Sequence, residues 1–294
     1  MKIAVVGSMN MDMLVHTSRI PHPGETLRGT DLEYQPGGKG ANQAVAMAKL
    51  GADVTMYGCL GKDAAGEQIL QNMERQGIHM EHVRILDAIV TGQALITIGE
   101  SDNTIIIIAG ANDYVNLEYL EKNMSSILEA DIIVLQNEIP QESVNEVIRA
   151  CHAKRKIIVL NPAPARKIEL DSIEKVTYLT PNEHEAELIF GREIEAAMHR
   201  YPEKLIVTRG KEGVAAVSKS QKMLVVPALK VEVVDTTGAG DTLNGAFCVG
   251  IAGGMDIEEA LKFANTAAGL SIQRYGAQTG MSELEEVRKK MQTC

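Results

Sequence analysis

Asp235-Thr-Thr-Gly-Ala-Gly-Asp241, followed at once by Thr242-Leu-Asn-Gly-Ala-Phe247, is the most informative stretch of this 294-residue chain. It places small residues and then a carboxylate at the predicted start of a helix. Small residues let a ligand approach the backbone closely, and the amides of a first helical turn are unpaired and partially positive. The pattern favours a site for an anion, such as a phosphoryl group in transfer, beside a base. The alternative for Asp241 is a helix N-cap, which does not require the preceding Gly-Ala-Gly.

Strand patterns and helical patterns alternate along the rest of the chain. This alternation predicts an α/β fold in which a mainly parallel sheet is covered by helices on both faces. Ligands in such folds bind beyond the carboxyl ends of the strands. The run Thr104–Ala109 is the longest aliphatic one, and its length predicts a buried strand. The predicted buried strands are Lys2–Gly7, Thr104–Ala109, Asp131–Gln136, Lys156–Leu160, Val176–Thr180 and Lys204–Thr208, and the predicted helices are Ala41–Leu50, Asn116–Glu129, Gln141–Ala153, Asn182–Phe190, Thr242–Ala252 and Ile257–Ser271.

Two segments interrupt the alternation, at about residues 12–36 and 90–104. The first holds short extended pieces around Pro21-His-Pro-Gly24, and the second alternates apolar and polar residues. Both patterns are typical of strands in a small separate sheet. We expect this sheet to project over the crevice as a lid, which a water-sensitive group transfer needs. Because exposed one-sided sheets tend to pair, the lid also predicts a homodimer.

Charge and composition exclude several classes of protein. The 39 acidic residues outnumber the 29 basic ones, and the net charge of −10 argues against nucleic acid as a partner. The absence of Trp leaves few stacking platforms for single strands. No segment has the length of an uncharged membrane span, and the N-terminus lacks a signal-peptide layout, so we expect a cytoplasmic protein that binds no membrane. The cysteines lack metal-like spacing and are expected to be reduced: Cys59, Cys151, Cys248 and Cys294.

A second glycine-rich stretch, Pro36-Gly-Gly-Lys-Gly-Ala-Asn42, opens the first predicted long helix. Its glycines allow close backbone contact with a ligand, while Lys39 offers a cation and Asn42 both a donor and an acceptor. A flexible loop with a chance lysine is the alternative. Neither a Walker loop nor a dinucleotide fingerprint is present, since no Gly-Lys pair continues with Ser or Thr and no G-x-G-x-x-G follows a strand.

Three further motifs follow predicted strands. Thr180-Pro-Asn-Glu-His-Glu185 contains a capping box, with Asn182 as the cap. It also forms an oxygen-rich segment that would help to hold hydrated Mg²⁺ near phosphates. Asn10-Met-Asp12 forms either an Asx turn or a set of polar side chains suited to a polyhydroxylated substrate. Val207-Thr-Arg-Gly-Lys-Glu-Gly213 is either an ordinary turn or a small-residue bed for a nucleotide. The histidines show no ligand spacing and are interpreted as surface or packing residues.

Together these segments resemble the ribokinase/PfkB family of carbohydrate kinases. The stretch Gly37-Gly-Lys-Gly-Ala-Asn-Gln43 is similar to the family's N-terminal signature, and residues 235–241 are similar to its C-terminal one. The Thr180-Pro-Asn-Glu segment with Glu185 is similar to its Asn-x-x-Glu motif. Because the three motifs occur in the family's order and separation, the resemblance covers essentially the whole chain. Segments that also resemble ribose-phosphorylating members are 7–12, 23–26, 37–43, 161–165 and 276–278.

The resemblance implies one domain over residues 1–294, a three-layer α/β/α sandwich with a β-sheet lid that often forms a dimer clasp. It implies ATP and Mg²⁺, and transfer of the γ-phosphoryl group to O5 of D-ribose. By the same resemblance, Asp241 is the base for the attacking hydroxyl, and the amides of Gly238, Ala239 and Gly240 form the anion hole. The implied sugar contacts are Asn10, Asp12, Gly38, Lys39, Asn42, Glu138 and Asp241. The implied nucleotide contacts are Asn182, Thr208, Gly210, Gly213, Gly240 and Asn265, with Glu185 ordering Mg²⁺ and its waters.

Family members also resemble one another in using a monovalent cation beside the anion hole. The corresponding positions here are Asp235, Thr237, Ser271, Arg274 and Gly276, several acting through backbone carbonyls. The chain departs from the pattern at Gly280, where a serine is usual, and at Thr279, where a proline is usual. One side-chain oxygen is therefore missing, and K⁺ activation is a hypothesis.

Alternative functions remain open at this stage. One keeps the chemistry and changes the acceptor to fructose, deoxyribose or a nucleoside. A different class is a sugar- or nucleotide-binding protein without catalysis, against which the intact Asp241 argues, since binding alone needs no base. A nicotinamide dehydrogenase is disfavoured because its glycine fingerprint is missing.

Overall fold

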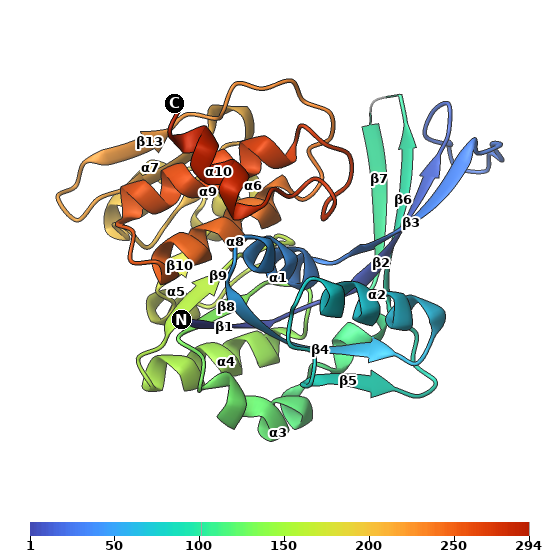
Figure 1. Cartoon of the computed structure of the whole chain (residues 1–294), viewed down its shortest axis with the longest axis horizontal. Coiled ribbons are helices and arrows are strands. Elements are labelled where there is room, and N and C mark those ends of the chain that lie inside the picture. The colour runs from blue at the N-terminus through green and yellow to red at the C-terminus, as the bar shows by residue number, and fades with distance from the viewer. Residues whose placement is uncertain (101, 294) are drawn as a thin grey trace.

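The computed structural model describes residues 1–100 and 102–293, so Ser101 in the predicted lid segment and the predicted thiol of Cys294 lie outside the described residues. Its centre is a six-stranded sheet in the order β10-β9-β8-β1-β4-β5 (Figure 1). All five strand pairs in this sheet are parallel, which confirms the predicted α/β class. The strands are β1 (Lys2–Val6), β4 (Asp53–Gly61), β5 (Val83–Leu86), β8 (Ile132–Leu135), β9 (Ile157–Leu160) and β10 (Tyr178–Leu179).

Helices cover both faces of this sheet because its strands are apolar on both sides. In β1, Ile3 and Val5 pack into one buried cluster, whereas Ala4 and Val6 pack into another. Since neighbouring residues of a strand point to opposite faces, the two clusters are the cores on the two sides of the sheet. The helices are α1 (Lys39–Lys49), α2 (Ala64–Arg75), α3 (Leu117–Ile127), α4 (Gln141–Ala153), α5 (Leu170–Lys175), α6 (Glu183–Phe190), α7 (Ile194–Arg200), α8 (Ala239–Ala252), α9 (Ile257–Ser271) and α10 (Leu284–Met291), with 3-10 turns η1 (Gly110–Tyr114) and η2 (Gly210–Glu212).

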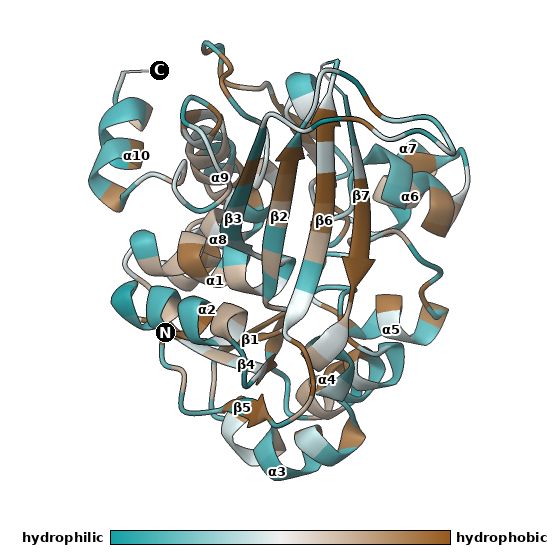
Figure 2. Cartoon of the chain, turned by 90° about the vertical axis from the view of Figure 1, so that its right-hand side faces the viewer, coloured by the Kyte–Doolittle hydropathy of each residue, from teal (hydrophilic) through white to brown (hydrophobic). Residues whose placement is uncertain are grey.

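A four-stranded lid sheet, in the order β3-β2-β6-β7, stands out from the body of the molecule (Figures 1 and 2). Its strands are β2 (Asn10–His16), β3 (Asp31–Gly37), β6 (Gly92–Gly99) and β7 (Asp102–Ile108). The prediction that Thr104–Ala109 is a buried strand is wrong. Residues 102–108 form the exposed edge strand of the lid sheet, because β6 and β7 make a hairpin away from the core.

A third sheet, in the order β11-β12-β13, is antiparallel. It consists of β11 (Val207–Thr208), β12 (Val214–Val217) and β13 (Met223–Val226). The predicted strand Lys204–Thr208 is wrong in two respects. Only Val207–Thr208 form a strand, and it belongs to this third sheet and not to the central one. A single parallel bridge, Leu179 to Leu205, still links residues 204–208 to the edge of the central sheet.

The helix that carries the glycine-rich carboxylate motif begins earlier than predicted. Helix α8 starts at Ala239, with Gly238 as its N-cap in a left-handed conformation, φ 76°. Asp241 is thus the third residue of the helix, and its interpretation as the N-cap is wrong. Gly238 replaces it because the backbone turns at a positive φ, where a side chain would be strained. Helix α9, in contrast, has the predicted bounds.

Two other sequence expectations concern the membrane and the thiols. Within residues 1–100 and 102–293, no helix combines the length and apolarity that crossing a bilayer requires. Cys59, Cys151 and Cys248 are free and buried.

Candidate active site

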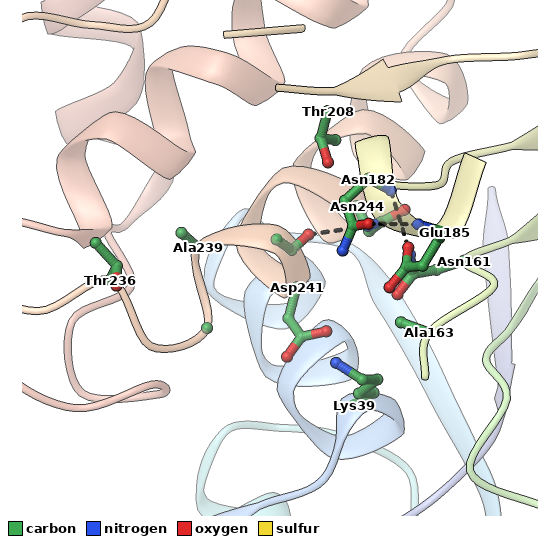
Figure 3. A pocket seen from close by; sticks show the side chains of 12 residues that line it. Lys39, Asn161, Ala163, Asn182, Glu185, Thr208, Thr236, Ala239, Asp241 and Asn244 are labelled. Atoms are coloured by element: carbon green, nitrogen blue, oxygen red, sulfur yellow. Dashed lines mark hydrogen bonds between the residues drawn. The ribbon is translucent and has the colours of Figure 1, made fainter. Parts of the chain in front are cut away.

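Polar loops meet at the carboxyl ends of the central strands. Residues 7–10 follow β1, residues 136–138 follow β8 and Asn161 follows β9, all on one edge of the sheet. The start of α8 closes this edge from the other side, and a cavity of about 140 Å³ lies between them. Figure 3 shows Asp241 and Lys39 pointing toward one another in this cavity. Its lining includes Lys39, Asn161, Asn182, Glu185, Thr208, Thr236, Gly238, Ala239, Gly240, Asp241 and Asn244.

Close packing of α1 on α8 places Asp241. A Cβ at Gly245 would lie 2.6 Å from the Cβ of Ala46, so only a glycine lets the two helices approach this closely. Asp241 lies one turn before Gly245, and Asn42 lies one turn before Ala46. The amide of Asn42 donates to Asp241 Oδ2 at 3.0 Å as a result. Asp241 is 7% exposed, so this carboxylate is largely shielded from bulk solvent.

The predicted sugar contacts lie together beside Asp241. Glu138 accepts hydrogen bonds from the Ser8 hydroxyl, at 2.5 Å, and from the backbone amide of Lys39, at 3.0 Å. Asn10 is buried and accepts a hydrogen bond from Asn112 at 2.7 Å. It begins strand β2, so the interpretation of residues 10–12 as an Asx turn is wrong. Gly38 is the N-cap of α1, at φ 87°.

Burial and neighbouring charges shift the pKa values of several side chains around Asp241. Burial opposes the charge of Lys39, but the surrounding carboxylates, Asp241 foremost, raise its pKa. Burial, together with the charges of Glu138 and Asp241, raises the pKa of Asp12 to about 7, against the opposing effect of Lys39. Burial also raises the pKa of Glu185, although the Asn182 amide and Lys39 act in the other direction. One cation, Lys39, therefore lies among several carboxylates and offsets part of their mutual repulsion.

The raised pKa of Asp12 predicts a pH-dependent stability. Between about pH 4 and pH 7 the folded protein holds a proton on Asp12 that the unfolded chain has released, so this group lowers stability as pH rises. Asp12→Asn should therefore stabilise the protein more at pH 8 than at pH 5, by about 2 kcal/mol. Denaturant unfolding at both pH values measures this difference, with Asp113→Asn at an exposed position as the control. An equal effect at both pH values would show that Asp12 titrates normally.

The first turn of α8 presents amides toward the cavity. Within the described residues, the backbone amides of Gly238 and Gly240 have no hydrogen-bond acceptor in the protein, whereas the Ala239 amide donates to the Thr236 carbonyl at 3.2 Å. In this backbone conformation, two of the three predicted anion-hole amides are thus free to donate to a ligand. A Cβ at Gly240 would meet no atom within 4 Å, so this glycine keeps the space in front of the amides open.

A larger cavity of about 750 Å³ continues from the first one past Thr208, Thr236, Ala239 and Gly240. The predicted nucleotide contacts Gly210, Gly213 and Asn265 line it. Its walls are mostly apolar, which suits an aromatic base. The sequence did not point to these wall residues: Pro227, Ala228, Leu229, Val231, Val233, Leu243, Ala268 and Ile272.

The predicted capping box at the start of α6 is confirmed. Asn182 accepts from the Glu185 amide and Glu185 Oε2 accepts from the Asn182 amide, both at 2.8 Å. Glu185 nevertheless lines the smaller cavity. Among the described residues, no group of three or more His, Cys, Asp or Glu side chains is arranged to hold a metal ion.

The predicted monovalent-cation residues also come together, next to the start of α8. The carbonyl oxygens of Ser271, Gly276 and Arg274 lie 2.7, 2.8 and 3.2 Å from where a Cβ of Gly280 would be. The Arg274 side chain turns away to Glu286, at 2.6 Å. Asp235 accepts from the backbone and hydroxyl of Thr237 and from the Gly276 amide. Three carbonyl dipoles thus converge on one small space.

Sequence reasoning missed several polar residues of the site. Gln43 donates to Asp241 Oδ1 at 3.0 Å, and Asn161 accepts from the same amide group at 3.1 Å. Asn244 lines the smaller cavity and donates to the Gly240 carbonyl at 2.9 Å. Gln43, Ser8 and Asn161 stand within motifs that the sequence singled out, but their partners are more than 30 positions away and only the fold reveals them.

Comparison with known proteins agrees with this geometry. The model of the pfkB family of carbohydrate kinases matches residues 1–284. Ribokinase from Bacillus subtilis (strain 168) is 46% identical over 288 residues, which cover 98% of this chain and 98% of that protein. The crystal structure of ribokinase from Thermotoga maritima has a TM-score of 0.89 at 37% identity, over 99% of both chains. The structure of Arabidopsis thaliana ribokinase complexed with ribose and ATP has a TM-score of 0.88 at 32% identity, over 98% of this chain and 97% of that one.

Proposed function

Because this chain belongs to the pfkB family of carbohydrate kinases, we propose that it transfers the γ-phosphoryl group of ATP to O5 of D-ribose. The observation that carries the proposal is the position of Asp241. Its carboxylate lies in one cavity with Lys39 and with the open first turn of α8. A base beside an anion site is what attack of a sugar hydroxyl on a phosphoryl group requires.

In the proposed reaction, Asp241 takes the proton of the attacking hydroxyl. The sugar is oriented by the cluster of Asn10, Asp12, Lys39, Asn42 and Glu138, with the backbone of Gly38 against it. Charge that builds on the transferring group is stabilised by the amides of Gly238 and Gly240, and Ala239 joins them if its turn opens. Phosphoryl transfer depends mainly on positioning and on charge stabilisation, and these residues supply both.

The nucleotide is proposed to occupy the larger cavity, with its base against the apolar wall and its phosphates toward Gly240. Asn182, Thr208, Gly210, Gly213 and Asn265 would border it. Mg²⁺ bound to the phosphates would neutralise their charge, and the residue that fits it is Glu185, whose second carboxylate oxygen is not used by the capping box. This fits a site where water and phosphate supply most ligands.

The direct test is ATP-dependent release of ADP with D-ribose, compared with fructose, 2-deoxyribose and a panel of nucleosides. We expect the highest kcat/KM with D-ribose. Preference for another of these acceptors would keep the kinase mechanism and replace the substrate. Binding of ATP without turnover on any acceptor would instead favour a binding protein without catalysis.

We further propose that K⁺ binds among the carbonyls of Ser271, Arg274 and Gly276, near Asp235 and Thr237, and raises turnover. Burial works against the charge of Asp235, but hydrogen bonds from Thr237 and Gly276 lower its pKa, so it stays anionic. Gly280 has no side-chain oxygen, so the three carbonyl oxygens would supply the coordination that a serine oxygen supplies elsewhere in the family.

We expect a higher rate in K⁺ than in a non-coordinating organic cation at equal ionic strength. Equal rates of the unmodified protein in both salts would refute the site.

A homodimer through the lid sheet is proposed from its outer face. Strand register places Tyr34, Met13, Leu95 and Ile106 in one row across the four strands, on the face opposite Asp12. Ile106 is 65% exposed, and Figure 2 shows the apolar colouring of β7. Such an apolar face is typical of an interface.

Ile106→Lys is expected to convert the dimer to a monomer, because a charge would enter the apolar row at its most exposed residue, on the edge strand β7. Light scattering coupled to gel filtration measures the mass of each protein. Leu170→Lys, at an exposed apolar position outside the lid sheet, is the matched control and should leave the mass unchanged. A monomer in the unmodified protein would contradict the proposal.

A cytoplasmic location is also proposed. It is supported by the three buried cysteines, which are free thiols, as is usual in a reducing compartment.

A further inference from the structure

Gln43 is a fully buried residue of α1 whose side chain makes three hydrogen bonds. Its Nε2 group donates to Asp241 Oδ1 at 3.0 Å and to Asn161 Oδ1 at 3.1 Å, and its Oε1 accepts from Gln136 Nε2 at 2.7 Å. The exposed fraction of Gln43 is 0%, and that of Gln136 is also 0%. The contact to Asp241 therefore operates without competition from bulk water, where a charge-assisted hydrogen bond is strong.

The ionised carboxylate sets the direction of every hydrogen bond in this group. A carboxylate only accepts, so Gln43 must point its NH₂ group toward Asp241. Its oxygen must then face Gln136, which must in turn donate its own NH₂ group. This leaves Gln136 Oε1 as a buried acceptor without a partner among the described residues. An unsatisfied buried acceptor costs free energy, so the arrangement favours orientation of Asp241 over local stability.

Backbone packing fixes Gln136, the residue of this hydrogen-bonded group that lies farthest from Asp241. A Cβ at Gly7 would overlap with Gln136 Oε1, so the carboxamide rests directly against the glycine backbone. Asn161 is held by the donation of its own NH₂ group to the Thr180 carbonyl at 2.9 Å. The three amides thus come from α1, from the residue after β8 and from the residue after β9. All are tied to the rigid edge of the central sheet.

We propose that Gln43 is a positioning residue that holds the Asp241 carboxylate in one orientation toward the acceptor hydroxyl, supported by Gln136 and Asn161. The proposal rests on the proposed role of Asp241 as the base. Asn42 holds Oδ2 and Gln43 holds Oδ1, so rotation of the carboxylate about its Cβ–Cγ bond is blocked from both sides. The remaining lone pairs are free to accept the substrate proton.

Two substitutions test the proposal by kinetics. Gln43→Met keeps the volume and removes both polar groups, and should lower kcat by about 10–100-fold, the value of a hydrogen bond to a charged group. The KM values for ribose and ATP should change less than threefold, since Gln43 is not part of the cavity lining. Gln136→Met removes only the support and should lower kcat by a few-fold. It removes the unpaired Gln136 oxygen but leaves Gln43 Oε1 without its donor, so the two effects on thermal stability should largely offset each other.

The pH dependence of kcat for Gln43→Glu distinguishes a positioning role from a merely structural one. Two carboxyl groups about 3 Å apart share one proton, so the carboxyl group introduced at position 43, when protonated at low pH, can still donate to ionised Asp241. The other charged groups that affect this pair are Lys39 on α1, Asp12 on β2, Glu138 after β8 and Glu185 on α6. We expect kcat of Gln43→Glu, relative to the unmodified protein, to fall at least tenfold between pH 6 and pH 8.5.

The outcomes separate this inference from the proposed function. A normal kcat for Gln43→Met and a pH profile of Gln43→Glu parallel to the unmodified protein, with Asp241→Asn inactive, would overturn the inference alone. An active Asp241→Asn variant would overturn both. If Gln43→Met does not fold, the pH profile of Gln43→Glu decides.

Discussion

Asp241→Asn is expected to reduce turnover by about a thousandfold, within the range of 10²–10⁴ for loss of a general base. The amide has the shape of the carboxylate but cannot accept the proton of the acceptor hydroxyl. It also turns an NH₂ group toward the donors of either Asn42 or Gln43, which costs one of the two hydrogen bonds that hold the side chain. Both effects act on the reacting group rather than on the cavities that bind the substrates.

Steady-state kinetics with D-ribose and titration calorimetry with each substrate distinguish these effects. We expect the affinities for ATP and ribose to remain within about threefold, because binding energy comes from groups other than the base. Asp113→Asn, which removes an exposed carboxylate outside both cavities, is the control and should behave as the unmodified protein. Turnover of Asp241→Asn within tenfold of the unmodified protein would remove Asp241 from the role of base.

Two glycine-to-alanine substitutions in the same turn are expected to affect different properties, one the turnover and the other the stability of the fold. Gly240 has open space at its Cβ position and borders both cavities, so Gly240→Ala should fold normally. Its methyl group would nevertheless stand before the amides of the anion site. We expect turnover to fall on the order of a hundredfold, the effect of losing one anion-hole donor.

Gly238→Ala is expected to destabilise the protein itself. Gly238 has φ 76°, and a Cβ there would lie 2.9 Å from the Cα of Ala277. The left-handed conformation and the backbone contact should together lower the free energy of unfolding by about 1–3 kcal/mol. Denaturant unfolding and kinetics on both variants make the comparison. A stable but inactive Gly238→Ala, or a fully active Gly240→Ala, would contradict this division of roles.

Local signals accounted for the parts of the fold that depend on neighbours in the chain. The capping box at Asn182 and Glu185 and the bounds of α9 follow from side chains and backbone groups within one helical turn. Two errors of prediction concern strands whose place depends on remote pairing. The aliphatic run at residues 104–109 has the composition of a core strand, but pairing with β6 carries it into the lid sheet. Strands β4 and β5 were not predicted at all, although β4 lies beside β1 in the central sheet.

The sequence by itself determined which residues carry the chemistry of this protein. Glycines, a lysine and a carboxylate in two short motifs have properties that belong to the residues themselves: small size, charge and unpaired amides. Only the tertiary structure decided how they act together. The close approach of α1 and α8 at Gly245 and Ala46 brings Asn42 and Gln43 to Asp241 across about 200 positions of chain. Hydrogen bonds reach about 3 Å, so such contacts exist only after the chain has packed.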